Sequence, residues 1–115
     1  MYESTGHITL ISDRDALIAV AGASKKEYLD KRISSLLESS MDGRKIIMET
    51  NAGTYEINKD HPENISSFVI APIISGGDPI GTVILLNKDD AVKMSELESK
   101  MAETAAGFLG KQMEQ

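Results

Sequence analysis

Two short segments near the start of the chain have hydrophobic patterns typical of β-strands. In ITLIS (8–12), Ile8, Leu10 and Ser12 alternate with Thr9 and Ile11, and LIAVA (17–21) is a second apolar run that ends at Gly22. The letters SDRD between them are typical of a turn, because Asp side chains accept hydrogen bonds from backbone N–H groups two residues on. This pattern predicts a β-hairpin.

Two capping boxes follow the predicted hairpin. The segments SKKE (24–27) and SLLE (35–38) each place Ser three residues before Glu, so that the two side chains satisfy free N–H groups at the start of a helix. They predict two short helices, with an apolar set that becomes buried: Tyr28, Leu29, Ile33, Leu36 and Leu37. Beyond Gly43, residues 45–48 and 54–57 are predicted to be short strands, and NKDHPEN (58–64) a polar loop.

The segment PIISGGDPIGTVILL (72–86) contains two dense apolar runs on either side of GGDPI. Apolar runs around a Gly/Asp/Pro cluster predict two antiparallel strands joined by a tight turn, here within residues 67–87. Because nearly every strand residue is apolar, both faces of this part of the sheet are expected to be covered.

The last segment has the pattern of an amphipathic helix that begins with a third capping box, Ser95–Glu98. Apolar residues recur at three- and four-residue spacing, which predicts packing onto a sheet. These residues are Met94, Leu97, Met101, Ala105, Phe108 and Leu109. Gly107 and Gly110 lie off this stripe, and either the close approach of another helix or simple tolerance of glycine explains them.

The order of elements predicts an α+β domain, with a central antiparallel sheet and helices on both faces. Its 115 residues fit one domain. The net charge of −6 leaves no basic stripe for gripping phosphates, so the chain is not expected to bind DNA by itself. The absence of Cys indicates an intracellular protein without disulfides. No apolar run approaches the length of a membrane span, and MYESTGH is not a signal peptide.

Catalytic chemistry has little support in the sequence. His7 and His61 have no carboxylate or thiol partner at ligand spacing, and the DRD at 13–15 is either a weak cation site or a solvated turn. GGDPIG connects two strands rather than opening a helix, so it is not a phosphate loop. We therefore expect no catalytic residue, no metal site and no cofactor, and we do not expect an enzyme.

The hairpin with GGDPIG resembles the closing hairpin of GAF domains, which are small-molecule sensor modules related to PAS domains. More of the chain, including SKKEYL, GDPIG and AAGFLGKQMEQ, is similar to the C-terminal domains of sporulation transcription regulators of the transition-state regulator family. The resemblance implies a GAF/PAS-like fold, with residues 1–115 as a single sensor domain. It also implies an N-terminal DNA-binding domain outside this chain, a homodimer or homotetramer, and a cytoplasmic location in the forespore.

The same resemblance limits the ligand. Cyclic-nucleotide-binding GAF domains carry Asn-Lys, then Phe, then Asp-Glu after the final strand, whereas here Asn87-Lys88 is followed by neither. Cyclic nucleotides are therefore disfavoured. Covalent bilin and haem iron are also disfavoured, because there is no Cys and no suitably placed His.

Two functions remain open. In the first, a GAF-like pocket senses a small molecule between the sheet and the helices that cross it. The lining residues expected from the family are Tyr28, Arg32 and Ile33 from the helices, and Tyr55, Ser67 and Val69 from the strands. The Arg32 guanidinium suits an anionic ligand, although Tyr28 and Ile33 also fit an ordinary core and Arg32 a solvated surface.

In the second function, the domain is a ligand-free oligomerisation module that sets the spacing of DNA-binding domains. The interface is then expected on the last helix, at Gly107, Phe108, Gly110 and Met113. The two functions can coexist, because a ligand that binds one quaternary state more tightly shifts the population toward it.

Overall fold

The structure, a computed structural model, describes residues 7–89 and 92–114. Five antiparallel strands form the main sheet in the order β2-β1-β7-β6-β3, and β4 and β5 form a small separate sheet. The strands are β1 (Ile8–Ser12), β2 (Leu17–Ala21), β3 (Ile47–Glu49), β4 (Gly53–Glu56), β5 (Pro62–Ile65), β6 (Ser67–Ser75) and β7 (Asp78–Asn87). The helices are α1 (Lys25–Tyr28), α2 (Ser35–Gly43) and α3 (Glu96–Met113).

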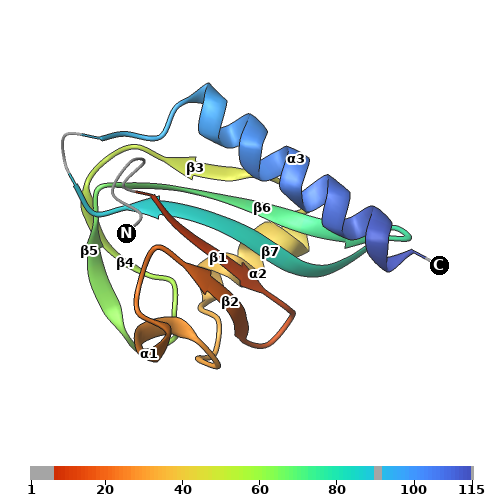
Figure 1. Cartoon of the computed structure of the whole chain (residues 1–115), viewed down its shortest axis with the longest axis horizontal. Coiled ribbons are helices and arrows are strands. Elements are labelled where there is room, and N and C mark those ends of the chain that lie inside the picture. Colours follow the sequence, from red (N-terminus) through yellow and green to blue (C-terminus); the bar gives the residue numbers. More distant parts are fainter. Residues whose placement is uncertain (1–6, 90–91, 115) are drawn as a thin grey trace.

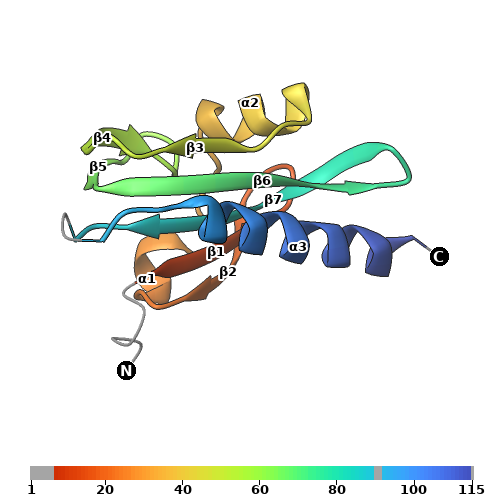
Figure 2. The ribbon, with the colours of Figure 1, turned by 90° about the horizontal axis from the view of Figure 1, so that it is seen from above.

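The two faces of the sheet carry separate hydrophobic clusters. On the long β6–β7 hairpin, Phe68 and Ile70 belong to the cluster that includes α1 and α2 residues, whereas Val69 and Ala71 belong to the cluster under α3. Figures 1 and 2 show α3 along one face of the sheet and α1 and α2 on the other. The predicted α+β architecture, with both faces covered, is therefore confirmed.

Local signals account for much of the first half of the chain. Asp13 Oδ1 accepts hydrogen bonds from the backbone N–H groups of Asp15 (2.7 Å) and Ala16 (2.8 Å), which closes the predicted turn between β1 and β2. Ser24 caps α1 by accepting a hydrogen bond from the Lys26 N–H, which confirms the Ser24 half of the predicted capping box. The capping box at Ser35 is wrong, because Ser34 is the N-cap residue of α2 and its side chain makes no capping hydrogen bond.

The predicted polar loop 58–64 contains the start of a strand. β5 begins at Pro62 and pairs with β4, so that Tyr55 lies opposite Glu63. Its residues 62–64 are polar or exposed, so the hydrophobic pattern gives no strand signal there. β5 forms because β4 supplies the partner for its backbone hydrogen bonds.

Helix α3 begins with the predicted capping box but packs with a different face. The Ser95 and Glu98 side chains cap the helix reciprocally. The residues buried against the sheet are Ala102, Ala106 and Gly110, whereas Leu97, Met101 and Phe108 are exposed. Met94 and Leu109 of the predicted stripe do pack against the cluster on the sheet, but the prediction is wrong for Leu97, Met101 and Phe108. The small residues face the sheet instead, because they let the helix backbone approach it closely.

The tip of the β6–β7 hairpin is held from both layers. Gly76 and Gly77 have φ of 58° and 86°, values that favour glycine. The Arg44 guanidinium, at the end of α2, donates to the Gly77 carbonyl through Nε (3.3 Å) and Nη2 (3.1 Å). The Gly76 N–H donates to Glu114 Oε2 (3.1 Å) at the end of α3. The tip thus joins the C-terminal ends of the two longer helices.

Candidate functional site

The six predicted lining residues do not meet in one cavity. Tyr28 and Ile33 are buried in the core between the sheet and the helices α1 and α2. Tyr55 packs against the same cluster and contacts Phe68 edge-to-face, with ring centroids 5.0 Å apart. These residues fill the space where a GAF-like pocket was expected, and the structure uses them as core.

Ser67 and Val69 lie on the opposite face of the sheet. Val69 belongs to the cluster under α3, and the Ser67 Oγ accepts a hydrogen bond from the Met94 N–H (2.9 Å). Successive side chains of a strand point to opposite faces, and β6 places Phe68 toward α1 and α2. Ser67 and Val69 therefore cannot line a cavity together with Tyr28 and Ile33, and that part of the predicted arrangement is corrected.

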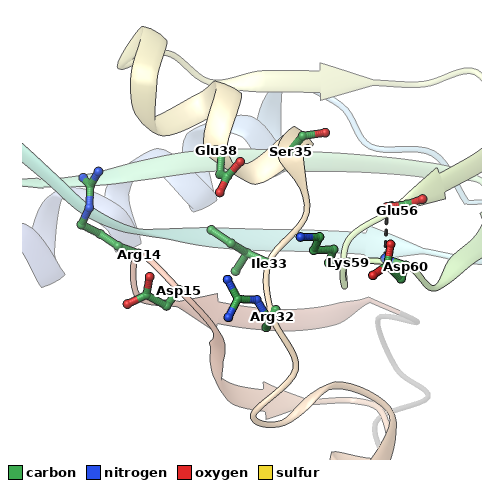
Figure 3. Close-up of a pocket in the computed structure, with 9 residues that line it drawn as sticks. All are labelled: Arg14, Asp15, Arg32, Ile33, Ser35, Glu38, Glu56, Lys59 and Asp60. Atoms are coloured by element: carbon green, nitrogen blue, oxygen red, sulfur yellow. Dashed lines mark hydrogen bonds between the residues drawn. The ribbon is translucent and has the colours of Figure 1, made fainter.

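Arg32 lines a surface pocket of about 260 Å³ at the start of α2. Three extended segments build its wall through backbone hydrogen bonds. The Ile33 N–H donates to the Asp15 carbonyl (3.0 Å), and the Lys59 N–H donates to the Arg32 carbonyl (2.8 Å). The middle segment also forms isolated β-bridges, Ala16 with Arg32 and Ile33 with Asn58. Side chains from the first turn, from the β4–β5 connection and from α2 are thereby brought to one place (Figure 3).

The pocket combines positive and negative groups with few internal partners. Among the described residues, the side chains of Arg32, Lys59, Asp15 and Glu38 make no hydrogen bond or ion pair with the protein, although all four line the pocket. The Asp60 carboxylate also lines the pocket without a partner among the described residues, whereas the Arg14 and Glu56 side chains are engaged. The Arg14 guanidinium donates to the Pro79 carbonyl (2.6 Å), and Glu56 Oε1 accepts from the Asp60 N–H (3.3 Å).

Of these lining residues, sequence reasoning selected only Arg32 and Ile33 for a ligand site. Asp15 was considered within DRD, where the structure shows the turn. Lys59 and Glu38 were missed. Only the long-range pairing of the extended segments places Lys59 beside Arg32, so the local sequence gives no sign of it. Glu38 lies in the first turn of α2, where the sequence pattern was explained by helix capping alone.

A partly buried polar cluster links α1 to the β4–β5 sheet and to Lys88, which directly follows β7. The Tyr28 hydroxyl donates to both Glu63 oxygens (2.8 and 3.0 Å), and Lys88 Nζ lies 2.7 Å from Glu63 Oε1. Burial, reinforced by Glu63, raises the pKa of Tyr28 far above its usual value. Burial acts to lower the pKa of Lys88, but the contacts with Glu63 and Tyr28 raise it overall. Tyr28 and Lys88 therefore keep their protonation states at neutral pH, and the cluster is a structural anchor.

Of the four predicted interface residues of α3, three are exposed to solvent and one is buried against the sheet. Phe108 and Met113 are 63% and 64% exposed, and Gly107 is open, because a Cβ added there would meet no atom within 4 Å. Gly110 faces the sheet instead, where an added Cβ would clash with the Ile74 carbonyl oxygen. Gly110 therefore cannot form an intermolecular contact, and its assignment to an oligomer interface is corrected.

Within residues 7–89 and 92–114, no group of three or more His, Cys, Asp or Glu side chains is arranged to hold a metal ion. His7 pairs instead with Glu98, with 3.5 Å between Nε2 and Oε2. None of the helices in this part of the chain is both long enough and apolar enough to cross a membrane.

The architecture is that of a GAF-like α+β domain. It is similar to the crystal structure of the GAF domain/HD domain protein from Geobacter sulfurreducens, with a TM-score of 0.66, and the match covers 95% of this chain and 80% of that chain. The sequence identity is 19%, so this similarity shows the fold alone.

The sequence defines the family more closely. Residues 1–114 match the family described as "Stage V sporulation protein T C-terminal, transcription factor". Over 115 residues the chain is 48% identical to stage V sporulation protein T of Bacillus subtilis (strain 168), and it spans 64% of that protein's length. The chain therefore belongs to the stage V sporulation protein T C-terminal family, which confirms the resemblance to sporulation transcription regulators.

Proposed function

We propose that this chain is the regulatory domain of a sporulation transcription factor, and that it senses a small-molecule effector at the Arg32 pocket. Family membership supports the regulatory role, and the GAF-like fold supports a sensor. DNA contacts come from an N-terminal DNA-binding domain of the longer protein, because this domain has a net charge of −6 and offers no basic stripe. The domain acts without catalysis, in the cytoplasm of the forespore.

The observation that carries the sensing proposal is the pair of unengaged cations at the pocket. Lys59 and Arg32 are adjacent through their backbone hydrogen bond, and neither side chain has a partner among the described residues. The convergence of three chain segments and the start of α2 around one hollow favours a binding site.

A thermal-shift screen of the 115-residue chain tests the proposal. The panel contains carboxylates, phosphorylated metabolites, nucleotides, amines and amino acids. An effector at roughly 1,000 times its dissociation constant adds about 4 kcal/mol of stability. The expected result is a saturable rise in Tm that Arg32→Ala abolishes and Lys31→Ala preserves, because Lys31 is exposed but lies outside the pocket. A saturable ligand whose affinity is unchanged in Arg32→Ala removes this pocket from the proposal.

The exposed face of α3 favours oligomerisation as a second function. Leu97, Met101 and Phe108 are 64%, 50% and 63% exposed, and their spacing places them on one side of the helix, away from the sheet. Met113 is also exposed, but it lies on the side of α3 that carries Ala106 and Gly110, where it lines a separate groove of about 370 Å³ with Ile18. A homodimer or homotetramer that covers the exposed face of α3 would set the spacing of the DNA-binding domains.

Sedimentation velocity tests the interface. Phe108→Glu places a charge on the exposed face and is expected to lower the association constant by at least about tenfold. Met48→Glu is the matched control, because Met48 is also an exposed apolar residue but lies on β3. An unchanged oligomer in Phe108→Glu, with a native far-UV spectrum, rules out this face of α3.

A further inference from the structure

We propose that the Arg32 pocket binds a small zwitterion, a molecule with one carboxylate and one ammonium group a few atoms apart, such as a free amino acid. This inference rests on the proposed sensing function and adds the chemical class of the effector.

The pocket offers unengaged charges of both signs. Arg32 and Lys59 are the cations, and Asp15, Glu38 and Asp60 are the anions; none of these five side chains has a partner among the described residues. A guanidinium forks onto a carboxylate, and a carboxylate accepts hydrogen bonds from an ammonium group. Each charge of a zwitterion therefore has a complementary partner here.

The charges are arranged around an apolar centre. Figure 3 shows Glu38 above Ile33 and Asp15 to its left, with Lys59 to its right and the Arg32 guanidinium beneath it in this view. Ile33 is almost fully buried, so its position is fixed by the core. Glu56 and Asp60 also line the pocket, on the side of Lys59 away from Ile33 in this view, so Arg32 is the cation that has no carboxylate drawn directly beside it. The arrangement matches a ligand whose carboxylate lies between Arg32 and Lys59 and whose ammonium lies toward Asp15 and Glu38.

Ligands with charges of a single sign fit less well. A phosphorylated ligand or a dicarboxylate would bring its negative charge beside Asp15 and Glu38, and a polyamine would bring positive charge beside Arg32 and Lys59. Like charges in a partly enclosed hollow repel, and this repulsion is a means of specificity as effective as attraction.

The size of the pocket also points to a small ligand. Its volume of about 260 Å³ lies just below the range of about 300–1,000 Å³ that is typical of pockets for drug-sized molecules. A free amino acid fits this space more readily than a nucleotide.

The test compares L-valine with two analogues that each lack one charge. Removal of the ammonium group from valine gives 3-methylbutanoate, and removal of the carboxylate gives isobutylamine. Glycine, alanine, leucine, serine and threonine extend the zwitterion panel. Each compound is titrated into the 15N-labelled 115-residue chain up to about 10 mM, which detects dissociation constants in the millimolar range. The amide signals of Ile33, Ser35 and Lys59 report on the pocket.

The expected result is a saturable shift of these signals with at least one amino acid. Its analogues without the ammonium or the carboxylate should each bind at least about tenfold more weakly, because a hydrogen bond to a charged group contributes on this order. Arg32→Gln should weaken the amino acid by a similar factor and leave the amine unchanged. Glu38→Gln should weaken the amino acid and the amine together, and Lys31→Gln, outside the pocket, should change nothing.

Two results would overturn the inference. If the carboxylate analogue binds as tightly as the amino acid, the pocket is an anion site. The proposed sensing function then still holds, but the proposal of a zwitterionic ligand is rejected. If no amino acid in the panel shifts the three amides, the zwitterion class is rejected. The broader thermal-shift screen then decides separately whether a different class of effector exists.

Discussion

Gly110→Ala is expected to destabilise the domain, although alanine is the better helix former. Gly110 lies inside α3 and faces the sheet, and an added Cβ would come far closer than 3.0 Å to the Ile74 carbonyl oxygen. Real Cβ atoms do not approach a backbone oxygen so closely. The obstacle is a strand backbone in the packed layer, so the helix has to move outward.

The magnitude follows from two opposing effects. In a helix interior, Ala is favoured over Gly by about 1 kcal/mol. Overpacking of a close-packed contact costs about 1–3 kcal/mol, and a rigid backbone neighbour places this case in the upper part of the range. The free energy of unfolding should therefore fall by about 1–2 kcal/mol. For a domain of this size, that corresponds to a decrease in Tm of roughly 4–10 °C.

Gly107→Ala, three residues earlier in the same helix, is the matched control. Gly107 has no neighbour within 4 Å of its Cβ position, so only the helix propensity changes and the variant should gain about 0.5–1 kcal/mol. Urea unfolding followed by far-UV circular dichroism measures both variants, since the chain has no Trp. If Gly110→Ala is as stable as the wild type, α3 does not rest on Ile74. If Gly107→Ala is destabilising, that position contacts another copy.

Two further predictions concern side-chain contacts. Tyr28→Phe removes the hydroxyl that donates to Glu63 and should cost about 2 kcal/mol in urea unfolding at neutral pH. The pKa of Tyr28 is raised in the folded protein, so the unfolded chain loses the hydroxyl proton first as the pH rises. The free energy of unfolding of the wild type should therefore decrease above pH 10.0, the usual pKa of tyrosine. Tyr28→Phe should lack the part of this decrease that comes from Tyr28. Hydrogen bonds from Ser95 hold the pKa of Glu98 below its usual 4.5, so the unfolded chain takes up a proton first as the pH decreases. Stability should decrease below about pH 4.5, and Glu98→Gln should show a smaller decrease; equal slopes in the two proteins would contradict the contact.

Sequence patterns predicted those elements whose determinants are local. The turn between β1 and β2 is closed by the Asp13 side chain, and the start of α3 is set by Ser95 and Glu98, in each case within four residues. The β6–β7 hairpin was predicted from its glycines and its apolar strands. β5 was missed because its strand character depends on pairing with β4, which no local hydrophobic pattern records.

The candidate site was only partly predictable for the same reason. Arg32 was selected because the family resemblance places a pocket beside the helices that cross the sheet. Asp15 and Lys59 reach it through backbone pairing between segments far apart in the sequence. Val69 was misplaced because every residue of β6 near it is apolar, so the alternation that normally distinguishes the two faces of a strand is absent.

Helix α3 shows that the most hydrophobic face of a helix is not always the face that packs against its own core. Apolar area favours burial of Leu97, Met101 and Phe108, but close approach to the sheet requires small side chains. Ala102, Ala106 and Gly110 allow that approach, and the large residues of the sheet itself, such as Val69 and Ile73, fill the layer beneath them. Because a helix can bury only one of two opposite faces against the sheet, the larger apolar face remains in solvent. Three large apolar side chains exposed on one side of a single helix form a surface that gains stability when another molecule covers it.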